Sequence, residues 1–154
     1  MAARICANAG GSRAMTIAQR AADAMLKGDH ATRWFGFEIT SVTEGAATLT
    51  LAVQPHHCNG HGILHGGVTF ALADTAFAYA CNSRNQMTVA QHNTISYLAP
   101  GQSSEVITAT AHEVYLMGRN GIYDVTVTRP DGTVLAQFRG QSRAIPGTLF
   151  ETAP

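Results

Sequence analysis

Charge is scarce in this chain and balanced in sign. Of its 154 residues, 13% are Asp, Glu, Lys or Arg, and the 10 basic residues equal the 10 acidic ones. A chain without a basic excess carries no electrostatic footprint for nucleic acid and no polybasic patch for an anionic membrane. Because 45% of the residues are hydrophobic, so sparse a polar shell indicates that an oligomer covers part of the surface.

Long apolar runs, paired cysteines and export signals are also lacking. No apolar stretch reaches about 18 residues without interruption, so no membrane-spanning helix is expected. The cysteines Cys6, Cys58 and Cys81 have neither the even number of a disulfide framework nor the paired spacing of a zinc site. The first 14 residues contain no apolar segment long enough for a secretory signal. We therefore expect a cytoplasmic protein with reduced thiols.

Length and pattern fit a single domain. A chain of 154 residues can bury a real core, and it contains no internal repeat or low-complexity segment. A helix-like run follows Met15, so residues 1–14 are expected to form a poorly ordered N-terminal extension. We predict one domain over residues 15–147 and a C-terminal tail over residues 148–154.

The first half of the chain predicts a helix, a hairpin, a loop and a second helix. Residues 16–27 (TIAQRAADAMLK) have apolar side chains at helical spacing behind a threonine cap. Residues 37–53 contain two β-like runs around Glu44–Gly45, which is a hairpin signal. The Pro, Asn and Gly content of residues 54–64 indicates a loop. The apolar stretch 65–82 that follows indicates a helix about 24 Å long.

The second half of the chain is nearly all strand. Four alternating stretches are rich in Val, Ile, Thr and Tyr, and they span residues 87–100, 104–118, 120–130 and 133–145. Asn120–Gly121 and Asp131–Gly132 are the strongest hairpin signals between them. This order of elements predicts an α+β fold, in which an antiparallel sheet carries a helix on one face.

The predicted long helix reads HGGVTFALADTAFAYACN and is apolar on nearly every side. A helix on an open sheet should show one polar face, so either the sheet wraps around it or a second subunit covers what remains exposed. Asp74 is the only carboxylate in this stretch, which has no Lys or Arg. Burying an ionised carboxylate without partners costs more than a domain can lose. Asp74 is therefore either a packing residue bonded to a buried polar group or a functional carboxylate facing a cleft.

The same helix opens with His65, Gly66 and Gly67. The unbonded N–H groups and the positive dipole end of a helix start suit an anionic oxygen, although a plain glycine turn is the alternative. Gly66 and Asp74 lie about 12 Å apart along one helix, whereas an oxyanion donor and a base must each act at about 3 Å. If both are catalytic, they come from different chains of a dimer with two composite sites.

Other site chemistries have less support. His56, His57, His61 and His65 crowd one region, but no local carboxylate or cysteine pair completes a zinc spacing, so no metal site is expected. Cys58 follows His57 directly, and adjacent side chains rarely point at each other as a catalytic pair must. No serine sits in a G-x-S-x-G elbow, which excludes the usual α/β hydrolase, and GHGILH lacks the third glycine of a dinucleotide fingerprint.

The order of elements, with NGHGILHGGVTFALADTAFAYACNS at its centre, resembles the hotdog-fold acyl-CoA thioesterases. Within them it is similar to the phenylacetyl-CoA thioesterases of bacterial phenylacetic acid degradation. The stretch LADTAFAYACNS and the FRG at residues 138–140 carry this resemblance. The resemblance covers residues 17–147. It implies an antiparallel sheet wrapped around one long central helix, a homodimer with joined sheets, pairing of dimers into a homotetramer, and no cofactor.

Carried over to this sequence, the resemblance places Asp74 at the catalytic carboxylate and Gly66 at the oxyanion position, with His65 beside it. Asn59 matches an active-site asparagine in the loop before the helix. Water activated by Asp74 would attack a thioester carbonyl polarised by the Gly66 N–H. Direct attack by Asp74, giving an acyl anhydride, stays open.

Coenzyme A carries phosphates, so basic residues are expected around the site. The candidates for phosphate binding are Arg84, Arg119, Arg139 and Arg143, and solvated surface arginines are the alternative for each. The residues assigned to substrate binding are Gly67, His61, Arg119 and Arg139. Hydroxylated phenylacetyl-CoA is the substrate that the resemblance suggests, and a medium-chain acyl group also fits an apolar pocket.

Two rival functions remain open on this fold. An acyl-CoA dehydratase or hydratase would need a histidine, here His65, to face Asp74 across the dimer. A non-catalytic acyl-CoA sensor would carry a DNA-binding segment, and this chain has neither a helix-turn-helix pattern nor a basic excess.

Overall fold

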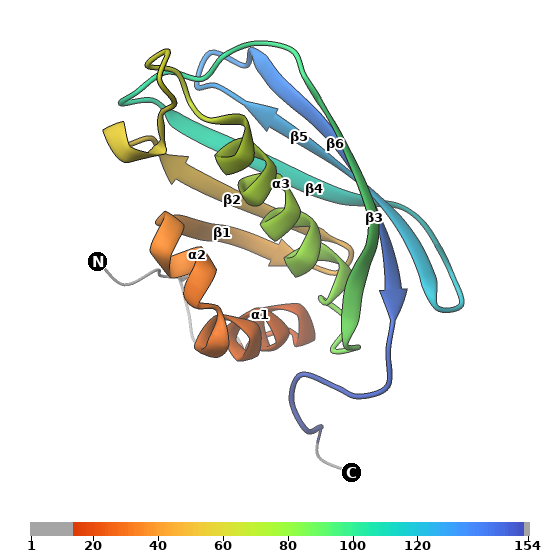
Figure 1. Cartoon of the computed structure of the whole chain (residues 1–154). Coiled ribbons are helices and arrows are strands. Elements are labelled where there is room, and N and C mark those ends of the chain that lie inside the picture. The colour runs from red at the N-terminus through yellow and green to blue at the C-terminus, as the bar shows by residue number, and fades with distance from the viewer. Residues whose placement is uncertain (1–13, 153–154) are drawn as a thin grey trace.

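The computed structural model describes residues 14–152 as one antiparallel sheet with a helix across its concave face (Figure 1). The central helix is α3 (Gly66–Cys81). The strands follow the order β1-β2-β4-β5-β6-β3, so β1 and β3 are the two edges. The predicted α+β architecture is confirmed. The predicted N-terminal extension falls outside the described residues except for Ala14.

Most strands follow the predicted alternation, with one side of the sheet packed on α3, whereas the edge strand β3 is exposed over most of its length. Their bounds are β1 (Phe37–Thr43), β2 (Ala46–Ala52), β3 (Thr88–Tyr97), β4 (Val106–Met117), β5 (Asn120–Thr128) and β6 (Val134–Ala144). β5 is buried at every second residue, which is the period of a half-buried strand. None of the helices within residues 14–152 is long and apolar enough to cross a membrane.

One predicted turn lies elsewhere. Asn120 pairs with Met117, so the β4–β5 hairpin turns at Gly118, which has a φ of +57°, and the prediction of a turn at Asn120–Gly121 was wrong. Gly121 lies inside β5, where an added Cβ would come within 2.7 Å of the Ser142 Oγ. Its glycine serves close strand packing rather than the turn.

Two helices cover the β1 edge of the sheet. α1 (Ile17–Gly28) begins at Thr16, whose hydroxyl accepts from the Gln19 N–H while the Gln19 side chain accepts from the Thr16 N–H. This capping box satisfies two amide groups at the helix start, and the predicted helix is confirmed. α2 (His30–Phe35) was not predicted, because six residues are too few to show a helical period.

α3 packs one side on the sheet and leaves a stripe uncovered. The buried side contributes Leu72, Ala73, Ala76, Phe77 and Ala80 to the core. The opposite stripe is partly or fully exposed and consists of Gly67, Ala71, Asp74, Thr75 and Ala78. The sheet of a single chain therefore does not enclose the helix, and the carboxylate lies on the side that the sheet leaves open.

Candidate active site

Asp74 is a half-buried carboxylate held by one hydrogen bond. The Asn93 side-chain amide donates to its Oδ1 over 2.8 Å. No Lys, Arg or His in the described part of the chain forms an ion pair with it. Burial raises the pKa of Asp74 above its usual range, and the bond from Asn93 opposes part of that rise. A carboxylate with a raised pKa binds a proton more readily, which suits a general base near neutral pH.

Asn93 is the residue at this site that the sequence interpretation missed. It lies on β3 opposite Gly140 of β6 and faces α3, as its bond to Asp74 requires. Its own Oδ1 is buried and has no hydrogen-bond partner within the described residues. The available signal was a polar side chain on the same face of the strand as Ile95, where an apolar one is expected.

The start of α3 presents backbone amide groups. His65 is the N-cap, and its Nδ1 accepts from the Gly67 N–H over 2.8 Å. The Gly66 N–H has no hydrogen-bond acceptor within residues 14–152, as expected for the first turn of a helix. The Tyr97 hydroxyl donates to the Gly66 carbonyl over 2.9 Å. An added Cβ at Gly66 would lie 3.2 Å from the Tyr97 ring, so only glycine fits there without a shift.

The loop before α3 is tied to the helix start. The His65 N–H donates to the His57 carbonyl over 2.9 Å, and Cys58 pairs with Leu64 as an isolated bridge. Asn59 lies within this loop, where its Oδ1 accepts from the His61 N–H over 2.9 Å. Asn59 is therefore held near the helix start with its side-chain amide nitrogen unbonded in the described structure.

His57 is the buried member of the histidine-rich loop. Its Nδ1 accepts from the Gln54 N–H over 3.0 Å, while its Nε2 is buried without a partner among the described residues. Burial lowers the pKa of His57, with the neighbouring His56 adding to the effect, so its ring is neutral at pH 7. Within residues 14–152 no three His, Cys, Asp or Glu side chains converge as metal ligands.

The two arginines assigned to substrate lie away from Asp74 within one protomer. Arg139 is on the sheet face opposite α3, because its neighbour Phe138 packs on Phe70 of the helix. There it forms a bidentate pair with Asp124 at 2.6 and 2.7 Å, and this bond lowers the pKa of Asp124. Arg119 lies in the β4–β5 turn, where its Nε donates to the Ala144 carbonyl over 3.0 Å.

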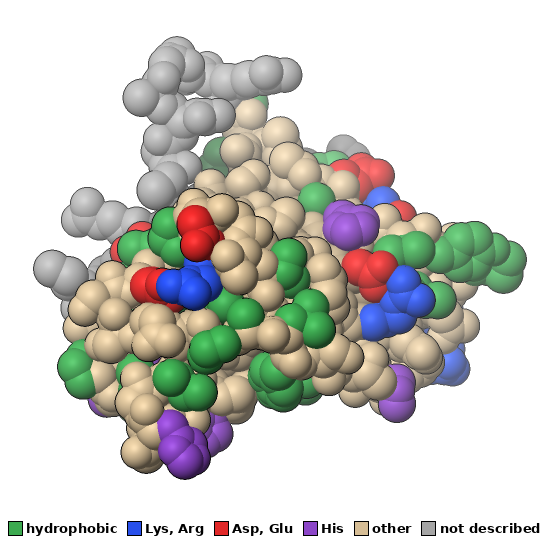
Figure 2. All heavy atoms as spheres, turned by 90° about the horizontal axis from the view of Figure 1, so that it is seen from above, with side chains coloured by type: hydrophobic (Ala, Val, Ile, Leu, Met, Phe, Trp, Pro, Cys, Tyr) green, Lys and Arg blue, Asp and Glu red, His purple; other side chains and the backbone are tan. Residues whose placement is uncertain are grey.

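Charged side chains occur as small mixed groups on the face of the molecule in Figure 2. Basic side chains there lie beside acidic ones, in keeping with the four ion pairs of the described chain. That face shows no continuous basic surface of the kind that nucleic acid binds.

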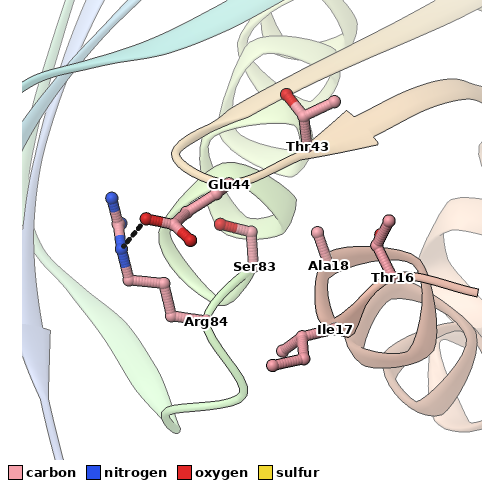
Figure 3. A pocket seen from close by; sticks show the side chains of 7 residues that line it. All are labelled: Thr16, Ile17, Ala18, Thr43, Glu44, Ser83 and Arg84. Atoms are coloured by element: carbon pink, nitrogen blue, oxygen red, sulfur yellow. Dashed lines mark hydrogen bonds and ion pairs between the residues drawn. The ribbon is translucent and has the colours of Figure 1, made fainter.

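Two hollows of the described protomer are lined by residues other than Asp74 and Gly66. The larger, of about 540 Å³, lies between the start of α1, the β1–β2 turn and the chain after α3 (Figure 3). Glu44 and Arg84 form an ion pair of 3.3 Å at its rim. The smaller, of about 110 Å³, lies between Cys81 and Arg119. Both are at the C-terminal end of α3, away from the Gly66 end of the helix.

A family model matches the middle of the chain, and curated relatives match most of it. The model described as the thioesterase superfamily matches residues 61–136. The acyl-coenzyme A thioesterase PaaI of Escherichia coli is 41% identical over 128 residues, which cover 83% of this chain and 91% of that protein. Human acyl-coenzyme A thioesterase 13 is 33% identical over 120 residues, which cover 75% of this chain and 86% of that protein.

Solved structures match the fold. The E. coli PaaI protein of the phenylacetic acid degradation operon superimposes with a TM-score of 0.84 over 86% of this chain and 96% of that one. A mutant of the phenylacetic acid degradation protein PaaI from Thermus thermophilus, 32% identical, gives a TM-score of 0.72 over 75% of this chain and 98% of that one. These matches confirm the predicted hotdog fold.

Proposed function

Because this chain belongs to the thioesterase superfamily and is a thioester hydrolase, we propose that it hydrolyses the thioester of phenylacetyl-CoA or a hydroxylated phenylacetyl-CoA. The observation that carries the chemistry is the half-buried Asp74, whose pKa is raised by burial, on a helix that begins with a glycine N–H left unbonded within residues 14–152. The aromatic acyl group is proposed from the similarity to PaaI proteins named for phenylacetic acid degradation.

In the proposed mechanism the Gly66 N–H donates to the thioester carbonyl oxygen and stabilises the negative charge that develops there. Asp74 of the partner subunit takes a proton from water as the water oxygen attacks the carbonyl carbon. The carbon–sulfur bond then breaks, releasing the free acid and the CoA thiolate. A thiolate leaves without strong acid help, because its pKa is far below that of an alkoxide. Nucleophilic attack by Asp74 itself is the alternative route.

Supporting roles are proposed for two residues near the helix start. His65 caps the first turn through its bond with the Gly67 N–H, so it holds the amide groups that meet the oxyanion. Asn59, with its side-chain nitrogen unbonded within the described structure, orients the water or the carbonyl. Both lie in the one loop-to-helix junction that presents Gly66.

The proposed enzyme is a homodimer whose sites combine two chains, and such dimers pair into a homotetramer. Gly66 and Asp74 are about 12 Å apart on one helix, so a partner must supply one of them. Two features support the pairing. β3 is an edge strand with Tyr97 54% exposed, and the uncovered stripe of α3 is made largely of small residues that let a second helix approach.

Substrate contacts beyond the reacting groups are proposals of the same kind. Gly67 and His61 lie beside the oxyanion position and would contact the thioester end of the substrate. Arg119, whose terminal nitrogens make no bond within the described residues, and Arg139, which is already paired with Asp124, would contact the CoA phosphates. We also propose a cytoplasmic location, for which the free thiols Cys58 and Cys81 are the support.

Release of CoA thiol tests the proposal. Purified protein is mixed with phenylacetyl-CoA, 3- or 4-hydroxyphenylacetyl-CoA and a straight-chain acyl-CoA, and thiol is followed with a chromogenic disulfide. We expect hydrolysis, fastest with the aromatic substrates, and its loss in Asp74→Asn at unchanged assembly by light scattering. No thiol release from any of these substrates would overturn the proposed reaction.

A further inference from the structure

We propose that Asn93 is the positioning residue of Asp74: its amide fixes Oδ1 of the carboxylate and leaves Oδ2 as the oxygen that meets the reacting water. The inference rests on the proposed function, in which Asp74 is the base. Nothing in the sequence pattern or the resemblance assigns a role to Asn93. The bond of 2.8 Å between its Nδ2 and Asp74 Oδ1 is the observation on which the inference depends.

β3 runs along α3 and contacts both proposed catalytic positions. Tyr97 bonds the carbonyl of Gly66, and Asn93, four residues earlier on the same strand face, bonds Asp74. Four strand residues span about 13 Å and eight helix residues about 12 Å. The distance from Asn93 to Tyr97 along β3 therefore matches the distance from Asp74 to Gly66 along α3. One strand therefore holds the oxyanion position at one end and the carboxylate at the other.

The backbone that carries Asn93 is fixed against the helix. Asn93 pairs with Gly140 of β6, and an added Cβ at Gly140 would lie 2.8 Å from the Phe77 ring on α3. Sheet and helix are therefore in close contact beside the Asn93–Asp74 bond. The separation between the amide and the carboxylate is set by packed backbone rather than by flexible side chains.

Packing alone does not explain an asparagine at this position. Its buried Oδ1 has no donor within residues 14–152, and a buried acceptor without a partner costs stability. An apolar side chain of similar shape would remove that cost. The benefit of an asparagine here is therefore its Nδ2, which donates a hydrogen bond to Asp74. Such a bond is what a residue that positions the carboxylate must make.

A neutral donor suits a carboxylate that must act as a base. It orients Oδ1 and favours the ionised form without the strong pKa depression that an arginine or lysine would cause. Burial raises the pKa of Asp74 and the Asn93 bond opposes the rise. Loss of the amide therefore moves the pKa of Asp74 further up, and the ionised base becomes rarer at neutral pH.

Three other ionisable groups on α3 and on the strands that face it are Cys81, Tyr123 and Glu113. Burial raises the pKa of the Cys81 thiol to about 12. Burial also raises the pKa of Tyr123, which faces α3 from β5. Glu113, which faces α3 from β4, is paired with Arg84. The inner faces of β3 and β6 carry no Lys, Arg, His, Asp or Glu, because His92, Arg139 and Arg143 alternate to the outer face.

The test compares Asn93→Ala and the near-isosteric Asn93→Leu with Thr94→Ala, a control on the exposed outer face of the same strand. The pH profile of kcat/KM is measured for each, with KM and kcat separated. We expect both Asn93 variants to lose about tenfold or more in kcat at neutral pH, with the acidic limb moved to higher pH and KM little changed. Thr94→Ala should match the wild type. Asn93→Leu removes the unbonded oxygen and, unlike Asn93→Ala, keeps the volume of the side chain, so it should fold even if Asn93→Ala does not.

A titration without substrate separates this inference from the proposed reaction. The side-chain carboxyl of Asp74 is followed by carbon NMR in wild type and Asn93→Leu. A higher pKa in the variant supports the positioning role whether or not thiol is released. An unchanged pKa of Asp74, or loss of kcat/KM without movement of the acidic limb, would show that Asn93 is only a packing residue.

Discussion

Two carboxylates, Asp74 on α3 and Glu113 on β4, have opposite surroundings. Glu113, near the C-terminal end of the helix, accepts from Arg84 at 2.6 and 3.3 Å and from the Tyr123 hydroxyl at 2.9 Å. Asp74, in the middle of the same helix, accepts from one neutral amide at 2.8 Å. Each oxygen of Glu113 has a partner and its charge is matched. Asp74 keeps a charge that nothing in the described protomer neutralises.

The difference separates a carboxylate that holds the fold from one that is available for chemistry. A buried charge that is paired and hydrogen-bonded contributes to a defined packing, whereas an unmatched one costs stability. Asp29 resembles Glu113 in having several donors, since it accepts from Thr32 at 3.0 and 2.6 Å and from the Tyr79 hydroxyl at 3.1 Å, although it forms no ion pair within the described residues. Asp74 is the exception among these acids because it has a single donor, and exceptions of this kind collect at functional sites.

The largest effect is expected when Asp74 is neutralised. Asp74→Asn keeps the shape and can keep the bond from Asn93, but it cannot take a proton from water. We expect kcat to fall by roughly 10²–10⁴-fold, measured by thiol release, with the same assembly by light scattering. A variant that retains more than a tenth of the wild-type rate would show that Asp74 is not the base.

The reverse pattern is expected at Glu113. Glu113→Ala leaves Arg84 without its main partner and the Tyr123 hydroxyl without its acceptor. Because the pair is only partly buried, we expect a loss of about 1–2 kcal/mol in unfolding free energy, measured by urea denaturation. The rate per folded molecule should stay near that of the wild type. A loss of rate without a loss of unfolding free energy would contradict the structural role assigned to Glu113.

A smaller effect is expected at the helix start. His65→Ala removes the side chain that accepts from the Gly67 N–H, and loss of an N-cap costs about 1 kcal/mol. If His65 positions the oxyanion amides, kcat should fall with the stability, and His65→Asn, which can also cap, should restore most of both. Full activity in His65→Ala would remove His65 from the proposed site.

The smallest effect concerns stability and pH at Asp74. Burial raises its pKa in the folded protein above the value of 3.8 for an unperturbed group, so the folded protein binds this proton more tightly than the unfolded chain. That contribution to stability is present below about pH 3.8 and is lost as pH rises through the folded pKa. At neutral pH, Asp74→Asn should therefore melt a few degrees above the wild type.

The same linkage sets the control for that measurement. The gap in melting temperature between wild type and Asp74→Asn should narrow as the pH is lowered toward the range in which Asp74 is protonated. A gap that is constant with pH would mean that the ionised carboxylate is not the cause. Glu113→Gln, at the matched carboxylate, should lower the melting temperature at neutral pH instead.

The sequence predicted those features that depend on neighbouring residues. The capping threonine, the Glu44–Gly45 turn and the 16-residue α3 all follow from local patterns. Asp74 was visible because a lone carboxylate in an apolar helix conflicts with its surroundings. The β4–β5 turn was placed two residues late because Asn120–Gly121 is a strong local signal. Gly121 is instead required because the side chain of Ser142, from a distant segment, leaves no room for a Cβ there.

The contact between Asn93 and Asp74 could not be predicted for the same reason. The two residues are 19 positions apart, and the β3 bulge between Ala90 and His92 reverses which side of the strand the Asn93 side chain faces. Only the assembled sheet shows that Asn93 meets Asp74. The roles assigned to Gly66, His65 and Asn59 remain predictions, since they depend on substrate and on a second chain.

The most direct measurement asks whether each site combines Asp74 of one chain with Gly66 of another. Asp74→Asn and Gly66→Val, which would place a side chain against Tyr97, are each expected to be inactive. If composite sites form, co-expressed chains should recover about one quarter of the wild-type rate, because half of randomly paired dimers are mixed and each has one intact site of two. If the two residues act within one chain, no mixed dimer has an intact site. A rate no higher than the sum of the two parents would then contradict the composite site.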